Sequence, residues 1–103
     1  MKCKIILTVQ HFEGCPNGPA MLANAAQAAA GFPGIVEFRE QVIETAEDAR
    51  KYDFRGSPTL LINGEDYEGM PVPGNPVMSC RFYPAGVPGP AAICSKIKSI
   101  TGG

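Results

Sequence analysis

The residue most able to do chemistry in this sequence is Cys15, which lies in a loop between Gly14 and Pro16. A cysteine at the start of a helix lies near unpaired backbone N–H groups and the positive end of the helix dipole, and both favour the thiolate. Pro19 leaves two alternatives open: the helix starts at Cys15, or it starts at Gly18 or Pro19 and leaves Cys15 in the preceding loop. The thiolate is the form that attacks disulfides, so Cys15 is the first candidate for a reactive residue.

Two further side chains could complete the chemistry of Cys15. Cys80 is expected on a strand and could act as a resolving thiol, provided that the fold brings the two α-carbons within roughly 7 Å; the alternative is a core residue. His11 could accept the thiol proton or stabilise the thiolate as a cation, and the alternative is a solvated side chain. Cys3 and Cys94 are interpreted as small buried hydrophobic residues.

Length and composition predict one domain, 1–103, with neither nucleic acid nor a membrane as partner. The chain has 103 residues and a net charge of −1, and it contains no basic run that could bind phosphates. No apolar stretch is long enough to span a membrane, and the N-terminal residues are typical of a strand rather than an export signal, so we expect a cytoplasmic protein. Because no Cys-x-x-Cys motif occurs, we expect no metal site, and nothing in the sequence indicates a cofactor.

The pattern of apolar residues predicts the order strand, helix, strand, helix, strand, strand, helix. These elements are expected at about 3–9, 19–30, 35–41, 46–52, 59–62, 79–83 and 90–100. Charged side chains in the second strand indicate a sheet edge. Thr45 with Asp48 predicts a capped start for the short helix, and Asn63-Gly64 predicts a tight turn after the third strand. A strand–helix–strand start predicts a parallel pair, and we expect the last two strands to be antiparallel.

Three motifs, in this order, resemble the thioredoxin superfamily. They are residues 12–17 (Phe-Glu-Gly-Cys-Pro-Asn), 54–59 (Phe-Arg-Gly-Ser-Pro-Thr) and 79–83 (Ser-Cys-Arg-Phe-Tyr). Together they are similar to a group of small bacterial thioredoxin-like proteins. The resemblance implies an α/β thioredoxin-like fold, β-α-β-α-β-β-α, with a four-stranded mixed sheet flanked by helices. It also implies that Pro58 follows a cis peptide bond and lies against the reactive cysteine.

The sequence departs from thioredoxin at Gly18, where thioredoxin carries a second cysteine. Exchange within one motif is therefore excluded, and a site with a single cysteine remains. The resemblance implies that Ser57 and Pro58, together with Pro16 and Asn17, bind the substrate. With Pro58 in the cis form, we expect the Ser57 backbone to be free to pair with an incoming peptide as an added strand.

The first function hypothesis is a thiol–disulfide oxidoreductase or redox partner, in which Cys15 attacks a disulfide and Cys80 or an external thiol resolves it. Its partner would be a thiol or disulfide of a small glutathione-like molecule or of a protein. Arg55 could attract a carboxylate of such a small molecule. The alternatives are a protein that binds Cu or Hg through its thiolates, and a catalytically inactive binding module of thioredoxin fold.

Overall fold

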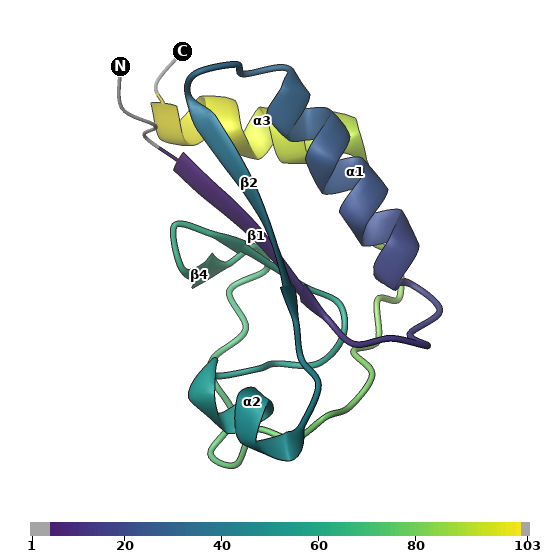
Figure 1. Ribbon diagram of the computed structural model, residues 1–103. Coiled ribbons are helices and arrows are strands. Elements are labelled where there is room, and N and C mark those ends of the chain that lie inside the picture. Colours follow the sequence, from purple (N-terminus) through teal and green to yellow (C-terminus); the bar gives the residue numbers. More distant parts are fainter. Residues whose placement is uncertain (1–4, 102–103) are drawn as a thin grey trace.

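A computed structural model of the chain describes residues 5–101 and contains one four-stranded mixed sheet with three helices (Figure 1). In chain order the elements are β1 (Ile5–His11), α1 (Gly18–Ala30), β2 (Val36–Val42), α2 (Ala46–Lys51), β3 (Thr59–Ile62), β4 (Glu65–Asp66) and α3 (Pro90–Thr101). The protein is therefore α/β, with the order of strands and helices that the sequence predicts. The first two residues of the predicted first strand, and Cys3 with its expected burial, lie outside the described residues.

Strand β1 occupies the interior of the sheet, whose strand order is β2-β1-β3-β4. It runs parallel to β2 and antiparallel to β3, and β2 forms an edge, as its charges predict. The main core lies on one face of β1, where its alternate side chains meet α1 and α3 (Figure 1). The buried members of this core are Ile5, Leu7, Val9, Met21, Ala25, Ala28, Ala29, Leu60, Ile62, Tyr83, Ile93 and Ile97. The opposite face of β1 is covered less completely, since Ile6 and Thr8 are half-buried.

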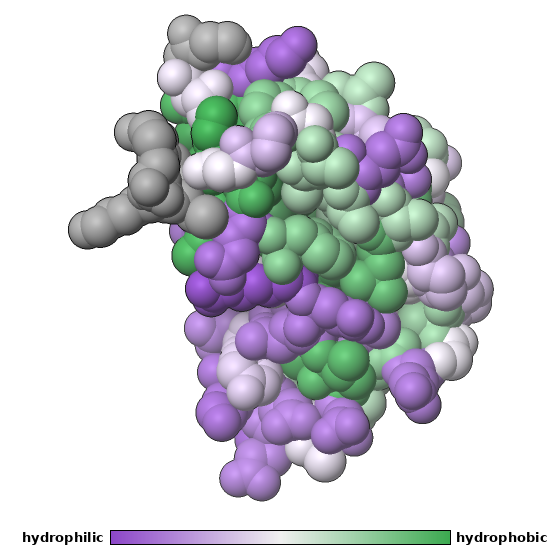
Figure 2. Space-filling model, turned by 45° about the horizontal axis from the view of Figure 1, so that its top comes forward, coloured by the Kyte–Doolittle hydropathy of each residue, from purple (hydrophilic) through white to green (hydrophobic). Residues whose placement is uncertain are grey.

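Helices α1 and α3 pack against each other over the same face of the sheet (Figure 1). The small side chains of the buried alanines in α1 allow this close approach. Other alanines of α1 are exposed, and pale green covers much of the upper part of the surface in Figure 2, above a mostly hydrophilic region. Ile93 and Ile97 of α3 are buried as predicted, but Ile100 is 46% exposed. It lies in the last turn of the helix, and its predicted burial is wrong. Within residues 5–101 no helix is long and apolar enough to cross a bilayer.

The fourth strand lies elsewhere than the sequence predicts. Asn63 and Gly64 both have positive φ, at 53° and 83°, and form the predicted tight turn. The chain then pairs back at once as β4, antiparallel to β3. Residues 79–83 form no strand, only a single parallel bridge. The prediction of an antiparallel strand at 79–83 is therefore wrong, because the two-residue strand after the turn takes that place in the sheet.

A second, smaller core forms around α2 and supports the chain leading into β3. Thr45 caps α2 as predicted, since its hydroxyl accepts the Asp48 N–H at 3.0 Å. Ile43, Ala49 and Phe54 are buried together beneath this helix. Phe54 is thereby fixed, and its ring packs edge-to-face against Phe12, the residue directly after β1.

Candidate functional site

Cys15 follows β1 and precedes α1, whose N-cap is Asn17. The helix starts at Gly18, so the second of the two alternatives is confirmed and Cys15 lies in the loop. Its side chain is buried, with 6% of the residue exposed, and its thiol donates to the Ser57 carbonyl at 3.4 Å. Cys15 is therefore a buried side chain whose hydrogen bond joins the loop after β1 to the segment before β3.

Ser57 is the residue around which the site is organised. The Ser57–Pro58 peptide bond is cis, as predicted. The Ser57 N–H donates to the Ser79 carbonyl at 2.8 Å, and the Ser57 carbonyl accepts the Arg81 N–H at 2.9 Å. The expectation that the Ser57 backbone is free was therefore wrong. Residues 79–83, which we call the strap, take the hydrogen bonds that an added peptide strand would need.

Three features hold the strap against Ser57. Gly56 has φ +106°, and a Cβ at this position would lie 2.9 Å from the Cβ of Arg81, so only glycine permits the close approach. The Arg81 guanidinium forms two hydrogen bonds with the Asp66 carboxylate, at 2.6 and 2.9 Å. The Tyr83 hydroxyl donates to the Pro58 carbonyl at 2.6 Å. The strap is therefore anchored by inward-facing side chains at two of its five positions.

The pair of Arg81 and Asp66 is almost fully buried, with 7% and 2% of the side chains exposed. The same carboxylate accepts the backbone N–H groups of Glu68 and Met70 at 2.9 and 3.0 Å. Burial alone would raise the pKa of Asp66, but the hydrogen bonds from Arg81 and these two amides outweigh it and hold the pKa below its usual value. Asp66 therefore stays ionised at neutral pH and ties the strap to β4.

Replacing Tyr83 by phenylalanine is expected to lower the free energy of unfolding by about 1–3 kcal/mol, because the buried Pro58 carbonyl would lose its donor. Burial raises the pKa of Tyr83 to about 12, so its hydroxyl carries the donated proton throughout the neutral range. Urea denaturation of both chains measures the difference. The matched control is Tyr52→Phe, at a half-buried tyrosine outside the site, which should change stability much less. Equal effects of the two substitutions would contradict the role given to the Tyr83 hydroxyl.

A cleft of about 410 Å³ opens beside Cys15, and we call it the thiol cleft. Its lining residues are His11, Phe12, Glu13, Gly14, Cys15, Pro19 and Leu22. His11 is buried, and its Nε2 lies 2.7 Å from a Glu40 carboxylate oxygen. The Cβ position at Gly18 lies 3.6 Å from His11 Nδ1 and 3.7 Å from Cys15 Cβ. A neutral imidazole that donates from Nε2 to Glu40 has its lone pair on Nδ1, on the side that borders Cys15.

Cys80 and Cys15 both neighbour Ser57, although they come from distant parts of the chain. Cys80 is the bridge partner of Ser57, and the Ser57 carbonyl that accepts the Cys15 thiol also accepts the N–H of Arg81, the residue after Cys80. Cys80 is exposed and Cys15 is buried, and both are free thiols. The fold therefore places two cysteines of unequal exposure beside the same residue, Ser57.

The remaining predicted site residues lie at different distances from this centre. Pro16 and Asn17 are exposed and directly follow Cys15 in the chain. Arg55 does not reach the thiol cleft: it lines a separate cleft together with Cys80. Cys94 is only half-buried in α3, so its predicted burial is confirmed in part, and its thiol is 3.9 Å from a carbonyl of α1.

Sequence reasoning missed the residues that hold the strap, namely Gly56, Asp66, Arg81 and Tyr83. The residue types give no usable signal, because Arg81 is buried whereas Phe82 is 82% exposed, the reverse of what hydropathy predicts. Nor do they indicate which carboxylate or which carbonyl the buried arginine and tyrosine bind.

Comparison with known protein families and with curated protein sequences finds no match to this chain. The site must therefore be interpreted from its own chemistry. Among residues 5–101 there is no group of three or more His, Cys, Asp or Glu side chains that could hold a metal ion. What the arrangement offers is a buried thiol, an exposed thiol, an imidazole and an open cleft.

Proposed function

We propose that this protein is a thioredoxin-like thiol–disulfide exchange protein in which Cys15 is the nucleophile. The observation that carries the proposal is the 3.4 Å hydrogen bond from the Cys15 thiol to the Ser57 carbonyl. It joins two of the three motifs on which the resemblance to thioredoxins rests, residues 12–17 and 54–59. The sheet order and the helix after β1 agree with such a fold.

The first step of the proposed reaction is loss of the Cys15 proton, and His11 is the side chain suited to accept it. Its Nε2 is engaged by Glu40, and its Nδ1 borders the space at Gly18 next to Cys15. An imidazole whose orientation is fixed by a carboxylate is a common arrangement for activating a nucleophile. Because Cys15 lies in the loop before α1 and not at its N-cap, the site offers His11, more than the helix dipole, for activation of the thiol.

In the second step the Cys15 thiolate attacks one sulfur of a substrate disulfide, R–S–S–R. A bond forms between Cys15 and that sulfur, the substrate S–S bond breaks, and its electron pair leaves with the other RS⁻. The Cys80 thiolate then attacks the Cys15 sulfur, which releases the second RS⁻ and forms a Cys15–Cys80 disulfide. The net change is reduction of one substrate disulfide by two protein thiols, and external thiols restore the reduced protein. The shared neighbour Ser57 supports Cys80 as the resolving thiol.

Mass spectrometry after treatment with a small disulfide is expected to separate these roles. The unmodified chain should lose two hydrogen atoms as Cys15 and Cys80 become linked, whereas Cys80→Ser should accumulate a mixed disulfide at Cys15, because no resolving thiol remains. Cys15→Ser should form no intramolecular link. Cys94→Ser is the matched control and should behave as the unmodified chain, since Cys94 lies in α3, away from Ser57. The proposal fails if peptide mapping finds no modification of Cys15 in any of these chains.

A further inference from the structure

We propose that the exchange reaction takes small, amine-bearing disulfides that enter the thiol cleft, and that the strap excludes extended polypeptides from Cys15. The inference rests on the proposed function and adds the chemical class of the substrate. It depends on two separate observations, the closed side of the site at Ser57 and the charge of its open side.

The closed side is the one where a peptide would have to pair. Both backbone groups of Ser57 are bonded to the strap, at 2.8 and 2.9 Å. The strap cannot simply be pushed aside, because the buried pair of Arg81 with Asp66 and the bond from Tyr83 to Pro58 hold it directly after the bridge at Cys80. A polypeptide that approached Cys15 as an added strand would need to break these contacts first.

The open side is the thiol cleft, and its size suits a small molecule. At about 410 Å³ it falls in the range of ligand pockets, and of its lining residues only His11 belongs to a strand. Pro19, Leu22 and Phe12 supply apolar surface, and Cys15 is part of the lining, whereas no strap residue is. A disulfide with short substituents can therefore reach the thiol without any movement of the strap.

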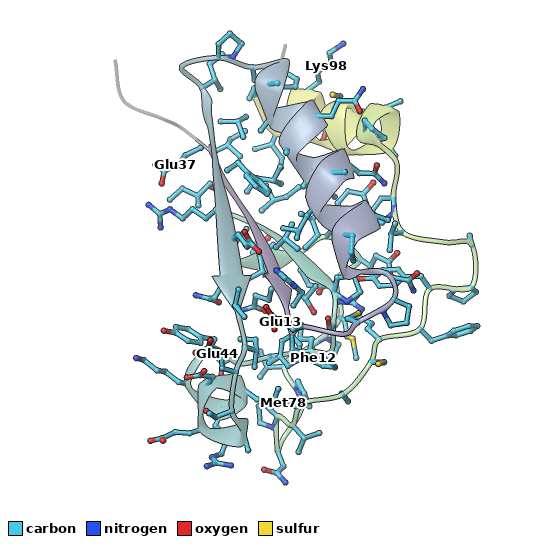
Figure 3. All side chains as sticks on the ribbon, turned by 45° about the vertical axis from the view of Figure 1, so that its right-hand side comes forward. Phe12, Glu13, Glu37, Glu44, Met78 and Lys98 are labelled. Atoms are coloured by element: carbon cyan, nitrogen blue, oxygen red, sulfur yellow. The ribbon has the colours of Figure 1, made fainter. Side chains whose placement is uncertain are left out.

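The charge of the open side is negative. Glu13 lines the thiol cleft and also a neighbouring cleft of about 330 Å³, in which Glu44 is a further carboxylate. Figure 3 shows Phe12, Glu13, Glu44 and Met78 gathered at this end of the sheet. Glu40 adds a third carboxylate through its contact with His11. Among the described residues no lysine or arginine lines either cleft. An approaching cation is attracted here, and an anion such as glutathione disulfide is repelled.

Rate constants for adduct formation at Cys15 test the inference, measured in the Cys80→Ser chain with peptide mapping. The probes are cystamine (cationic), 2-hydroxyethyl disulfide (neutral), glutathione disulfide (anionic) and a disulfide-linked peptide. Reversing the charge at Glu13 with Glu13→Lys should slow the reaction with cystamine and speed the reaction with glutathione disulfide, each by roughly tenfold at low salt. The rate constant for the neutral probe should remain nearly unchanged. Glu37→Lys is the matched control, because Glu37 is an exposed carboxylate at the far end of the sheet (Figure 3).

The peptide probe tests the strap. It should react with Cys15 at least about a hundredfold more slowly than the neutral small probe, because the strap must open first. Gly56→Ala, which pushes Arg81 away, should speed the peptide reaction selectively; if that chain does not fold, Tyr83→Phe serves the same purpose. If no probe modifies Cys15, the proposed function itself is wrong. A different outcome is that Cys15 reacts with the peptide as fast as with the neutral small probe, or reacts at rates that do not depend on Glu13. Either result would keep the proposed exchange function and overturn the proposed substrate class.

Discussion

A chain with Gly18 replaced by cysteine is expected to form a disulfide between the introduced thiol and Cys15 under mild oxidation. The Cβ position at Gly18 lies 3.7 Å from the Cβ of Cys15, close to the mean separation found in disulfides. Gly18 is the first residue of α1 and does not need a positive φ, so a side chain introduces no backbone strain. The geometry at Gly18 therefore accommodates a second cysteine next to Cys15.

The consequence for reactivity should be large. Because a disulfide sulfur is no longer a thiolate, alkylation of Cys15 in the oxidised Gly18→Cys chain should fall by roughly two orders of magnitude or more, and a reductant should restore it. The measurement is best made with Cys80→Ser as background, so that only the new pair can link. Gly18→Ser in the same background is the control, because it fills the same space without a thiol. Persistent free thiols in the oxidised chain would show that the loop holds Cys15 differently from the geometry described here.

The local elements were predictable from the sequence because their signals are local. Thr45 with Asp48 gave the start of α2, Asn63-Gly64 gave the tight turn, and charged side chains placed β2 at the edge. The fourth strand was not predictable in the same way. Glu65–Asp66 is acidic and only two residues long, so it has no strand propensity, and it pairs because the turn returns it to β3.

The candidate site was predictable in its parts and not in its arrangement. The cis bond at Pro58 followed from the motifs, whereas the sequence left open whether the helix starts at Cys15 or after it. The pairing of the strap with the Ser57 backbone could not be predicted. It depends on the register between two segments that lie more than twenty residues apart and are joined by a stretch rich in Pro and Gly. The sequence also does not show that Arg81 is buried and forms an ion pair with Asp66. Tertiary contacts of this kind decide which side of a reactive thiol is open.

Replacing Asp66 by alanine is expected to lower the free energy of unfolding by roughly 3–5 kcal/mol, because it leaves the buried Arg81 guanidinium without its partner. The strap should loosen with it, since the same substitution removes the two side-chain bonds that hold Arg81. Urea denaturation gives the stability, and the alkylation rate of Cys15, which should rise, reports the loosening. The double substitution Asp66→Leu with Arg81→Met removes both charges and should cost much less than Asp66→Ala alone.

The exposed pair of Arg39 with Glu37 is the matched control, and Glu37→Ala should change stability by less than about 1 kcal/mol. The sign of the pH dependence follows from Asp66, whose pKa is lowered in the folded chain by its hydrogen bonds from Arg81 and the backbone. A lowered folded pKa contributes stability that is complete above the unfolded value of about 3.9 and is lost as the pH falls through the folded value. The difference in stability between the unmodified chain and Asp66→Ala should therefore be constant from neutral pH down to about pH 4 and shrink below it. A difference that instead grew on acidification would mean that Asp66 does not anchor the strap as an ionised carboxylate.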